Sequence, residues 1–326
     1  MNILLNIVTM SYKILIEDRN YTDWNLYDGM SLQEVSKLDI NPSSLKLFSG
    51  DTFEYIPNDM SYNESQIRVL HSCVRSMSSI PGILVLKDGK TFGKTGKNNN
   101  EKYLYKCIPD DKRFPIFTVP YALKVGFSKN IDNKYIVFRF DNWNGKHPQG
   151  TIVSVLGDVD VLSNYYEYQL YCKSLYASIQ NFNKAATDSL KQKTEPEFIS
   201  SMINKYNLVD RTTEPVFSID SKETADYDDA FSIIDTGNNS YKLSIYIANV
   251  PLWMEELELW NSFSERISTI YLPDRKRPMM PLSLSTCVCS LCEQVVRLAF
   301  AIDITIVNGE ITLNAIYIIL YIILII

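Results

Sequence analysis

The chain has 326 residues, of which 46% are hydrophobic and 21% charged, an ordinary composition for a globular protein of two or three domains. Its net charge of −6 gives no global basic signature of nucleic-acid binding, so any surface of that kind has to be local. Because the only two histidines are His71 and His147, the composition argues against a Ser-His-Asp or Cys-His catalytic mechanism.

The first residues, MNILLNIVTMSYKIL, are apolar but lack a basic region and a small-residue cleavage site. We therefore expect no signal peptide and an intracellular location, in the cytoplasm or the nucleus. Six cysteines occur, and the last three (Cys287, Cys289 and Cys292) form C-x-C-x-x-C with no second pair or histidine nearby. This spacing favours buried thiols in a reducing compartment over the alternative of a zinc site.

Residues 1–75 contain short apolar runs separated by turn signals. Strands are predicted over residues 12–17, 52–56 and 66–73. Ser31 followed by Glu34 has the spacing of a capping box and predicts a short helix over residues 31–38. The pattern indicates a first small β domain.

Residues 76–160 show the same pattern of short apolar runs separated by turn signals. Strands are predicted over residues 82–86, 103–108, 116–119, 135–140 and 150–156, with Gly/Asn/Asp/Lys-rich turns between them. Short strands at this spacing are typical of a small barrel or sandwich, and two such domains in tandem are consistent with two small β-barrels.

A local basic segment lies inside the second β domain. Residues 87–113 carry eight Lys or Arg against four Asp or Glu, a local charge of +4, with aromatic residues interleaved. This pattern fits a barrel face that binds single-stranded RNA, and the alternative is a solvated lysine-rich hairpin. The candidate RNA-binding residues here are Lys90, Phe92, Lys94, Tyr103 and Arg113.

The chain changes character after residue 160. Residues 161–210 lose their Gly and Pro turn signals and show helical periodicity, broken near Glu195-Pro196. Apolar β runs return from Val216, and a helix is predicted over residues 255–267. The sequence therefore predicts a helical connector followed by a second α+β region.

The segment VFSIDSKETADYDDAFSII, residues 216–234, holds the densest group of carboxylates. Four of them form the pattern D-x5-D-x-D-D between two apolar runs: Asp220, Asp226, Asp228 and Asp229. Such crowded like charges repel unless a cation neutralises them, and oxygen-only ligands suit Mg²⁺. The alternatives are a solvated acidic turn and an EF-hand loop, although the glycine and distal glutamate of an EF-hand are not at the required spacing.

The last residues, 311–326, read ITLNAIYIILYIILII and are almost entirely apolar. They fall short of the ~18–20 residues that a membrane span requires. We favour a core strand followed by out-of-frame or truncated sequence over a tail anchor, and so do not expect membrane association.

Several motifs, in order, resemble the RNB-domain exoribonucleases, which include RNase II, RNase R and the catalytic subunit of the eukaryotic exosome. The D-x5-D-x-D-D loop is similar to that family's signature, and YKLSIYIANV follows as its V-x-I-A-D-V strand does. SERISTIYLPDRKRPMMPLSLSTCVCSL and VRLAF resemble later family motifs, with Asn249 and Val296 where aspartates are usual. Upstream, YKCIPDDKRFP and DNWNGKHPQGTIVSVLGDVD resemble the second cold-shock barrel, in wording closest to the exosome branch.

The resemblance implies an α+β protein in which tandem OB-fold (cold-shock-like) β-barrels precede the N-terminal part of an RNB catalytic domain. Its expected domains are a first barrel, partial or divergent (1–75), a second barrel (76–160), a helical connector (161–210) and a truncated RNB portion with an apolar tail (211–326, tail 311–326).

The resemblance also implies an activity: Mg²⁺-dependent 3′–5′ hydrolysis of single-stranded RNA that releases 5′-mononucleotides. Asp220, Asp226 and Asp229 would hold Mg²⁺, and Asp228 would be the catalytic carboxylate. Two ions ~4 Å apart would clamp the attacking and leaving oxygens. Tyr271 stands where the family has an aromatic that stacks on a base, the alternative being a core tyrosine.

The sequence departs from the family after about Leu313, before the arginine, glutamate and second aromatic that the rest of an RNB domain supplies. Because such an arginine stabilises the transition state, we expect the isolated chain to be a poor or inactive nuclease. Expected partners are single-stranded RNA and either an exosome-like complex or the missing C-terminal half. The alternative function is a single-stranded RNA-binding module with a vestigial catalytic domain.

Overall fold

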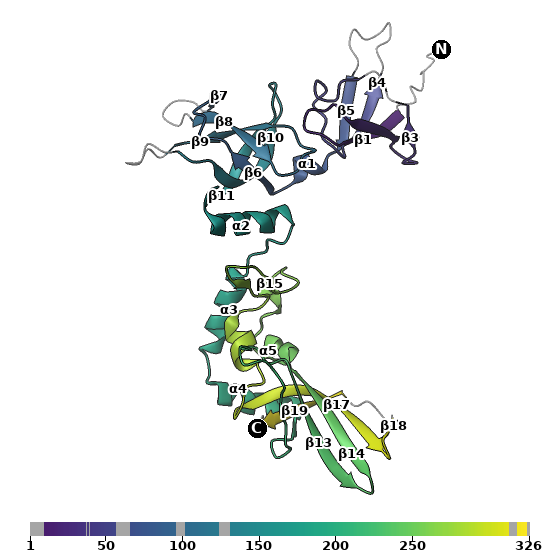
Figure 1. Cartoon of the computed structure of the whole chain (residues 1–326), viewed down its shortest axis with the longest axis vertical. Helices are drawn as coiled ribbons and strands as arrows, with labels where there is room; N and C mark the ends of the chain where they lie inside the picture. The colour runs from purple at the N-terminus through teal and green to yellow at the C-terminus, as the bar shows by residue number, and fades with distance from the viewer. Residues whose placement is uncertain are drawn as a thin grey trace, which may run out of the picture. The chain divides into compact units, whose positions relative to one another are not determined.

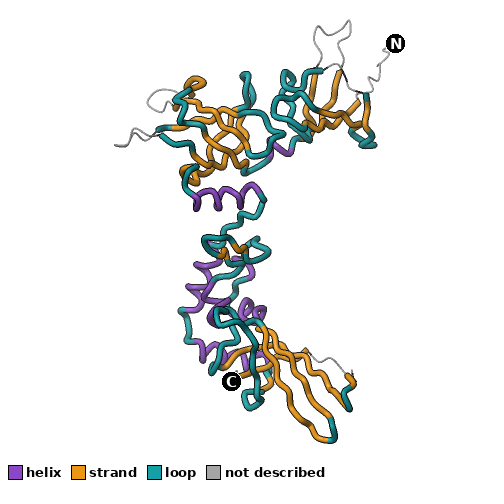
Figure 2. Tube along the Cα trace, viewed as in Figure 1, coloured by secondary structure: helices purple, strands orange, loops and turns teal. Residues whose placement is uncertain are grey.

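The computed structural model describes residues 10–36, 38, 40–56, 66–95, 102–123, 131–312 and 318–324. The chain divides into two compact units, Met1–Tyr176 and Ala177–Ile326. Figure 1 labels their helices and strands, and Figure 2 shows that strands dominate the first unit, whereas the second combines a helical part with a sheet.

The first unit opens with a five-stranded antiparallel sheet in the order β3-β2-β1-β4-β5. Its strands are β1 (Met10–Ile16), β2 (Trp24–Asp28), β3 (Glu34–Val35), β4 (Thr52–Ile56) and β5 (Gln66–His71). The three strands predicted here are confirmed, but the helix predicted over residues 31–38 is wrong. Asp28 accepts the hydroxyl of Ser31 at 2.9 Å, so this side chain does not cap a helix, and Val35 pairs with Leu26 at the sheet edge.

The second sheet closes on itself. Its order is β6-β10-β11-β9-β8-β7, and β6 also pairs with β8, which joins five strands into a barrel. Gly82 and Gly150 flank the ring of Phe138 inside it, where an added Cβ would lie 3.0 Å and 2.6 Å from that ring. The strands are β6 (Ile80–Leu84), β7 (Thr91–Thr95), β8 (Lys102–Pro109), β9 (Phe117–Tyr121), β10 (Lys134–Asn142) and β11 (Gln149–Asp158).

Both sheets of the first unit share one hydrophobic core. Phe48 stacks on Phe117 with ring centroids 5.9 Å apart and packs on Trp143 at 4.9 Å. The short helix α1 (Cys73–Ser76) joins the sheets, and helix α2 (Leu162–Cys172) covers the barrel by stacking Tyr168 on Tyr135.

The second unit contains helices α3 (Gln180–Leu190), α4 (Glu195–Tyr206) and α5 (Val250–Glu256) packed on a sheet in the order β12-β19-β17-β14-β13, with β18 paired to β17. Phe182, Phe198 and Trp253 fill the core between the helices. The strands are β12 (Val209–Asp210), β13 (Asp229–Gly237), β14 (Ser240–Ala248), β17 (Val296–Val307), β18 (Glu310–Thr312) and β19 (Ile318–Leu324), with a separate hairpin of β15 (Ile270–Tyr271) and β16 (Lys276–Arg277).

The helix predicted over residues 255–267 is wrong in its position. Asn249 caps α5 by accepting the amide of Leu252 at 3.1 Å, and a proline follows in the first turn, so the helix starts earlier. Glu258 takes a positive φ of 55°, after which only a 3₁₀ turn (Trp260–Ser262) forms.

The apolar tail joins the central sheet. Its residues 318–324 form β19, which pairs with β17 and β12, while residues 313–317 and 325–326 lie outside the described residues. Among the described residues, no helix is both long and apolar enough to cross a membrane.

Candidate active site

The acidic loop begins and ends on the same edge of the sheet. An isolated bridge joins Phe217 to Phe231 through reciprocal amide–carbonyl bonds of 3.0 and 2.9 Å, and their rings lie 4.2 Å apart. The run VFSI, predicted as a strand, therefore forms isolated bridge residues instead of a strand. The bridge closes the base of the loop, from which the carboxylates project.

The C-terminal end of the loop is fixed by neutral partners. The amide of Tyr227 donates to Ser290 Oγ at 2.9 Å, and the carbonyl of Tyr227 accepts from Leu291 at 2.9 Å. The carbonyl of Asp228 accepts from Ala248 at 2.9 Å, where β13 meets β14. The backbone that carries Asp228 and Asp229 is therefore set by neighbouring strands and by the Ser290 turn.

The four aspartates of the motif share an electrostatic environment. Asp220, Asp228 and Asp229 are exposed and Asp226 is partly buried. Desolvation raises the pKa of Asp228, and the charges of Asp226, Asp229 and Asp220 raise it further. The aspartates are thus close enough to repel one another, as the spacing predicted.

Their donor chemistry fits a hard divalent cation, because every side chain offered is a carboxylate. Within the described ranges, however, no three His, Cys, Asp or Glu side chains converge in a metal-binding arrangement. The sequence motif therefore brings the aspartates into one loop without drawing their oxygens to one point. The same observation gives no support to zinc at the C-x-C-x-x-C cysteines, whose Cys289 is buried and whose Cys287 is exposed.

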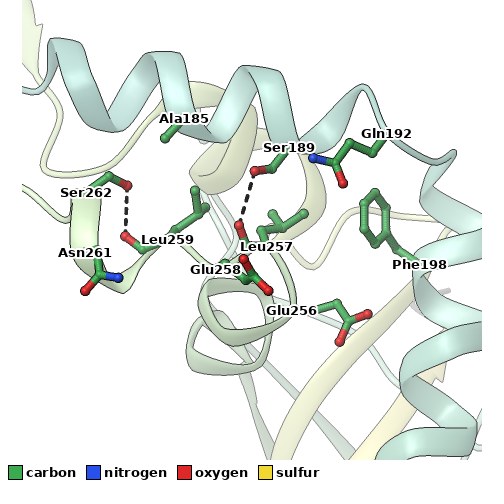
Figure 3. Close-up of a pocket in the computed structure, with 10 residues that line it drawn as sticks. All are labelled: Ala185, Ser189, Gln192, Phe198, Glu256, Leu257, Glu258, Leu259, Asn261 and Ser262. Atoms are coloured by element: carbon green, nitrogen blue, oxygen red, sulfur yellow. Dashed lines mark hydrogen bonds between the residues drawn. The ribbon is translucent and has the colours of Figure 1, made fainter.

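A hollow of about 300 Å³ lies beside the loop. Its lining includes Asp220, Tyr227 and Glu293. A second hollow, of about 380 Å³, lies between α3 and the turn after α5, where Ser189 donates to the carbonyl of Leu257 at 3.2 Å (Figure 3). It contains none of the predicted site residues, so the first hollow is the candidate active-site cavity.

Tyr271 lies on the β15–β16 hairpin and is 75% exposed, so the alternative of a core tyrosine is wrong. Directly opposite it, Lys276 extends to the acidic loop, with Nζ 3.4 Å from both carboxylate oxygens of Asp226. Sequence reasoning missed Lys276. Its only signal was a basic run, DRKRP, directly after the motif aromatic.

A buried ion-pair network supports the segment that leads into the loop. Arg211 donates to Asp303 through Nη1 at 2.8 Å and Nη2 at 2.6 Å, and Ser244 donates to the same carboxylate at 2.7 Å. Glu214 accepts from Lys242 and Tyr246, both at 2.8 Å. These contacts hold residues 211–214 on the sheet, and sequence reasoning missed them because the partners are far apart in the chain.

The predicted RNA-binding residues of the barrel form two cation–aromatic pairs on and beside β7 and β8. Lys90 Nζ lies 5.6 Å from the centroid of Phe92, and Lys94 Nζ lies 5.0 Å from that of Tyr103. Phe92 also meets His147 edge to face at 6.1 Å. The structure thus brings together four of the five predicted residues.

Two hollows, of about 330 and 600 Å³, adjoin this face and share Phe92 and His147 in their linings. Burial lowers the pKa of His147, and the charges of Lys146 and Lys106 lower it further. Arg113 lies apart from this cluster and pairs with Asp111 at 2.7 Å. His147 is an addition that the sequence analysis did not assign to the face, whereas Lys106, which lines the smaller hollow, belongs to the predicted basic segment.

A closed barrel followed by a sheet that carries a carboxylate loop is the arrangement that the RNB-domain resemblance predicted for residues 76–326. Residues 208–317 match the RNB domain family, and residues 104–168 match the Dis3-like cold-shock domain 2 family. These matches identify an RNB domain region and a Dis3-like cold-shock domain in the chain, as the resemblance implied, and the predicted α+β fold class is confirmed.

Individual relatives agree with this assignment. The chain is 29% identical over 166 residues to ribonuclease R of Thermotoga maritima, covering 50% of this chain and 22% of the relative. It is 27% identical over 213 residues to the mouse exosome complex exonuclease RRP44, covering 64% of this chain and 21% of the relative. The matches thus span about a fifth of the length of these relatives.

Solved structures share the fold. Mycoplasma genitalium RNase R in complex with ribose-methylated single-stranded RNA matches with a TM-score of 0.62 and 18% identity, over 96% of this chain and 46% of that one. Yeast Ssd1, a pseudonuclease, matches with a TM-score of 0.54 and 15% identity, over 97% of this chain and 43% of that one. At such identities the likeness concerns the fold alone, and the fold occurs with and without nuclease activity.

Proposed function

We propose that this protein is a magnesium-dependent 3′–5′ exoribonuclease that hydrolyses single-stranded RNA and releases 5′-mononucleotides. The observation that carries the proposal is the acidic loop, in which desolvation and three neighbouring carboxylates raise the pKa of Asp228. A charge arrangement of this kind is costly in a purely structural loop and is common where a cation is bound.

In this proposal Asp220, Asp226 and Asp229 hold Mg²⁺, and Asp228 acts at the scissile phosphate. Bound Mg²⁺ supplies Lewis-acid stabilisation of the phosphate and a nucleophile derived from water. Asp228 positions the attacking water by accepting its hydrogen bond, on a backbone held by Ser290 and Ala248. Tyr271, exposed on its hairpin, stacks on a base near the 3′ end.

The proposal assigns the barrel face the role of holding single-stranded RNA, through stacking on Phe92 and Tyr103 and through phosphate contacts of Lys90 and Lys94. It includes an intracellular location, in the cytoplasm or nucleus, which suits six cysteines of which none is in a disulfide. The similarity to the mouse exosome exonuclease supports an exosome-like complex as a partner.

The test is a cleavage assay on the 326-residue chain with a 5′-labelled single-stranded RNA, in Mg²⁺ and in EDTA. We expect this chain to shorten the RNA slowly, from the 3′ end, and to release 5′-mononucleotides in Mg²⁺ only, with no shortening by Asp228→Asn. Internal cleavage, or equal activity of the wild type and the variant, would refute the assigned reaction.

One observation favours a second function, a single-stranded RNA-binding module with a vestigial catalytic domain. The described carboxylates do not converge in threes, whereas the aromatic and basic face of the barrel is formed. A gel shift separates the two functions. RNA binding with no cleavage by either the wild type or Asp228→Asn supports the binding module, and cleavage by the wild type alone supports the enzyme.

A further inference from the structure

Lys276 links the acidic loop to the hairpin that carries Tyr271. Its Nζ lies 3.4 Å from both carboxylate oxygens of Asp226, and both side chains are a little over a third exposed. Lys276 and Tyr271 are directly opposite in the antiparallel pair, so their side chains project from the same face of the hairpin. A cation, a carboxylate and an exposed aromatic ring are therefore neighbours.

Side-chain hydrogen bonds brace the hairpin that presents them. Arg277, which is 6% exposed, donates to both carboxylate oxygens of Asp274 at 3.0 Å and to the carbonyl of Arg275 at 2.9 Å. The amide of Met279 donates to Thr269 Oγ1 at 3.2 Å across the same turn. The position of Lys276 is thus determined by the hairpin itself, in addition to its ion pair with Asp226.

We propose that Lys276 is a phosphate-binding residue that forms one nucleotide-binding subsite with Tyr271. The base stacks on Tyr271, and the ammonium of Lys276 binds a phosphate of the same nucleotide or its neighbour. An ammonium that donates to carboxylate oxygens also donates to phosphate oxygens, which offer the same charge and acceptor geometry. This inference rests on the proposed function, because it assumes that RNA reaches the acidic loop.

The ammonium of Lys276 can bind either the carboxylate of Asp226 or a phosphate of the RNA. In the state described, its charge neutralises Asp226. A divalent cation held by Asp226 would repel the ammonium of Lys276, whose backbone stays paired with that of Tyr271. RNA binding and the Lys276–Asp226 contact therefore compete for the same ammonium, and this competition can be measured without turnover.

The first test is fluorescence anisotropy with a labelled oligoadenylate, in EDTA, on the full chain. Lys276→Met is expected to weaken binding about 3- to 10-fold near 0.1 M salt and to reduce the slope of log K against log salt by about 0.7, the value for one phosphate contact on a single strand. Arg275→Met is the matched control. It removes an equal charge one residue away, from a side chain that meets Asp274 at 3.8 Å.

The second test is a cycle of charge-removing variants in EDTA. Asp226→Asn and Asp228→Asn remove the same charge, but only the first releases Lys276. Asp226→Asn is therefore expected to strengthen RNA binding at least about 3-fold more than Asp228→Asn, and this excess should disappear when Lys276 is methionine. Circular dichroism confirms that each variant is folded before binding is compared.

The outcomes separate this inference from the function on which it rests. Wild-type chain that fails to bind RNA overturns the proposed function. If the wild-type chain binds RNA, but Lys276→Met binds no more weakly than Arg275→Met and Asp226→Asn shows no excess, the proposed nucleotide-binding subsite is overturned. The proposed function then stands. A selective loss at Lys276 together with the excess supports the subsite.

Discussion

Replacing Arg211 by methionine should destabilise the second unit strongly, because its guanidinium is buried against Asp303. The Arg211 side chain is 10% exposed and the Asp303 side chain 24%, and two bonds of 2.8 and 2.6 Å join them. Breaking a fully buried pair costs about 3–5 kcal/mol. We expect the lower end, about 3 kcal/mol, since Asp303 is partly exposed and keeps its bond from Ser244.

For a unit of this size, 1 kcal/mol corresponds to about 2–4 °C in Tm, so Arg211→Met should lower Tm by about 6–12 °C. Thermal unfolding followed by circular dichroism measures this shift. Lys191→Met is the control, because Lys191 meets Asp188 at 3.7 Å with both side chains at least 60% exposed. Such a surface pair contributes less than about 1 kcal/mol.

The double variant Arg211→Met, Asp303→Leu tests the reasoning itself. It removes both charges, so no uncompensated buried charge remains, and it should recover most of the lost stability. Equal effects of Arg211→Met and Lys191→Met would refute the argument from burial. A double variant less stable than either single variant would show that the attraction of the pair, and not its desolvation, sets the cost.

Three further outcomes follow from the site. Burial and neighbouring carboxylates raise the pKa of Asp228, so its ionised carboxylate costs stability at neutral pH. Asp228→Asn should therefore abolish nucleotide release and raise Tm in EDTA, and an unchanged Tm would contradict this. Phe92→Ala should weaken oligoadenylate binding by about 1–3 kcal/mol in anisotropy titrations, and unchanged affinity would remove Phe92 from the RNA face. Arg211 lowers the pKa of Asp303, so this pair should stabilise the fold above about pH 4 and lose its effect as pH falls through the lowered pKa. The difference in Tm between the wild type and Arg211→Met should therefore shrink in acid.

The sequence pattern predicted the strands well because the apolar run of a strand lies within a few consecutive residues. The runs at residues 52–56 and 135–140 alternate or concentrate apolar residues between turn signals, and they form β4 and the centre of β10. The two misplaced helices show the limit. At Ser31 a hydrogen bond to Asp28 decided the result, and at Glu258 a positive φ did, and helical periodicity encodes neither.

The candidate site was predicted in part for a similar reason. Its carboxylates are adjacent in sequence and carry a family motif, so spacing alone located the loop. Lys276, which contacts Asp226, lies 50 residues after it in the chain. Arg211 pairs with Asp303, which is 92 residues away. Contacts of that separation are set by strand order, and no pattern in the sequence specified which lysine would face which aspartate.

The acidic loop can fold before a cation binds because its anchors carry no net charge. The Phe217–Phe231 bridge, the Ser290 hydroxyl and the amide of Ala248 bind backbone groups of the loop and its flanks. Repulsion is confined to side chains that reach water, where it is screened. Neutralisation by a cation should therefore change the electrostatics and the side-chain positions at Asp228 far more than the path of the backbone. It follows that chelation should abolish cleavage without unfolding the second unit.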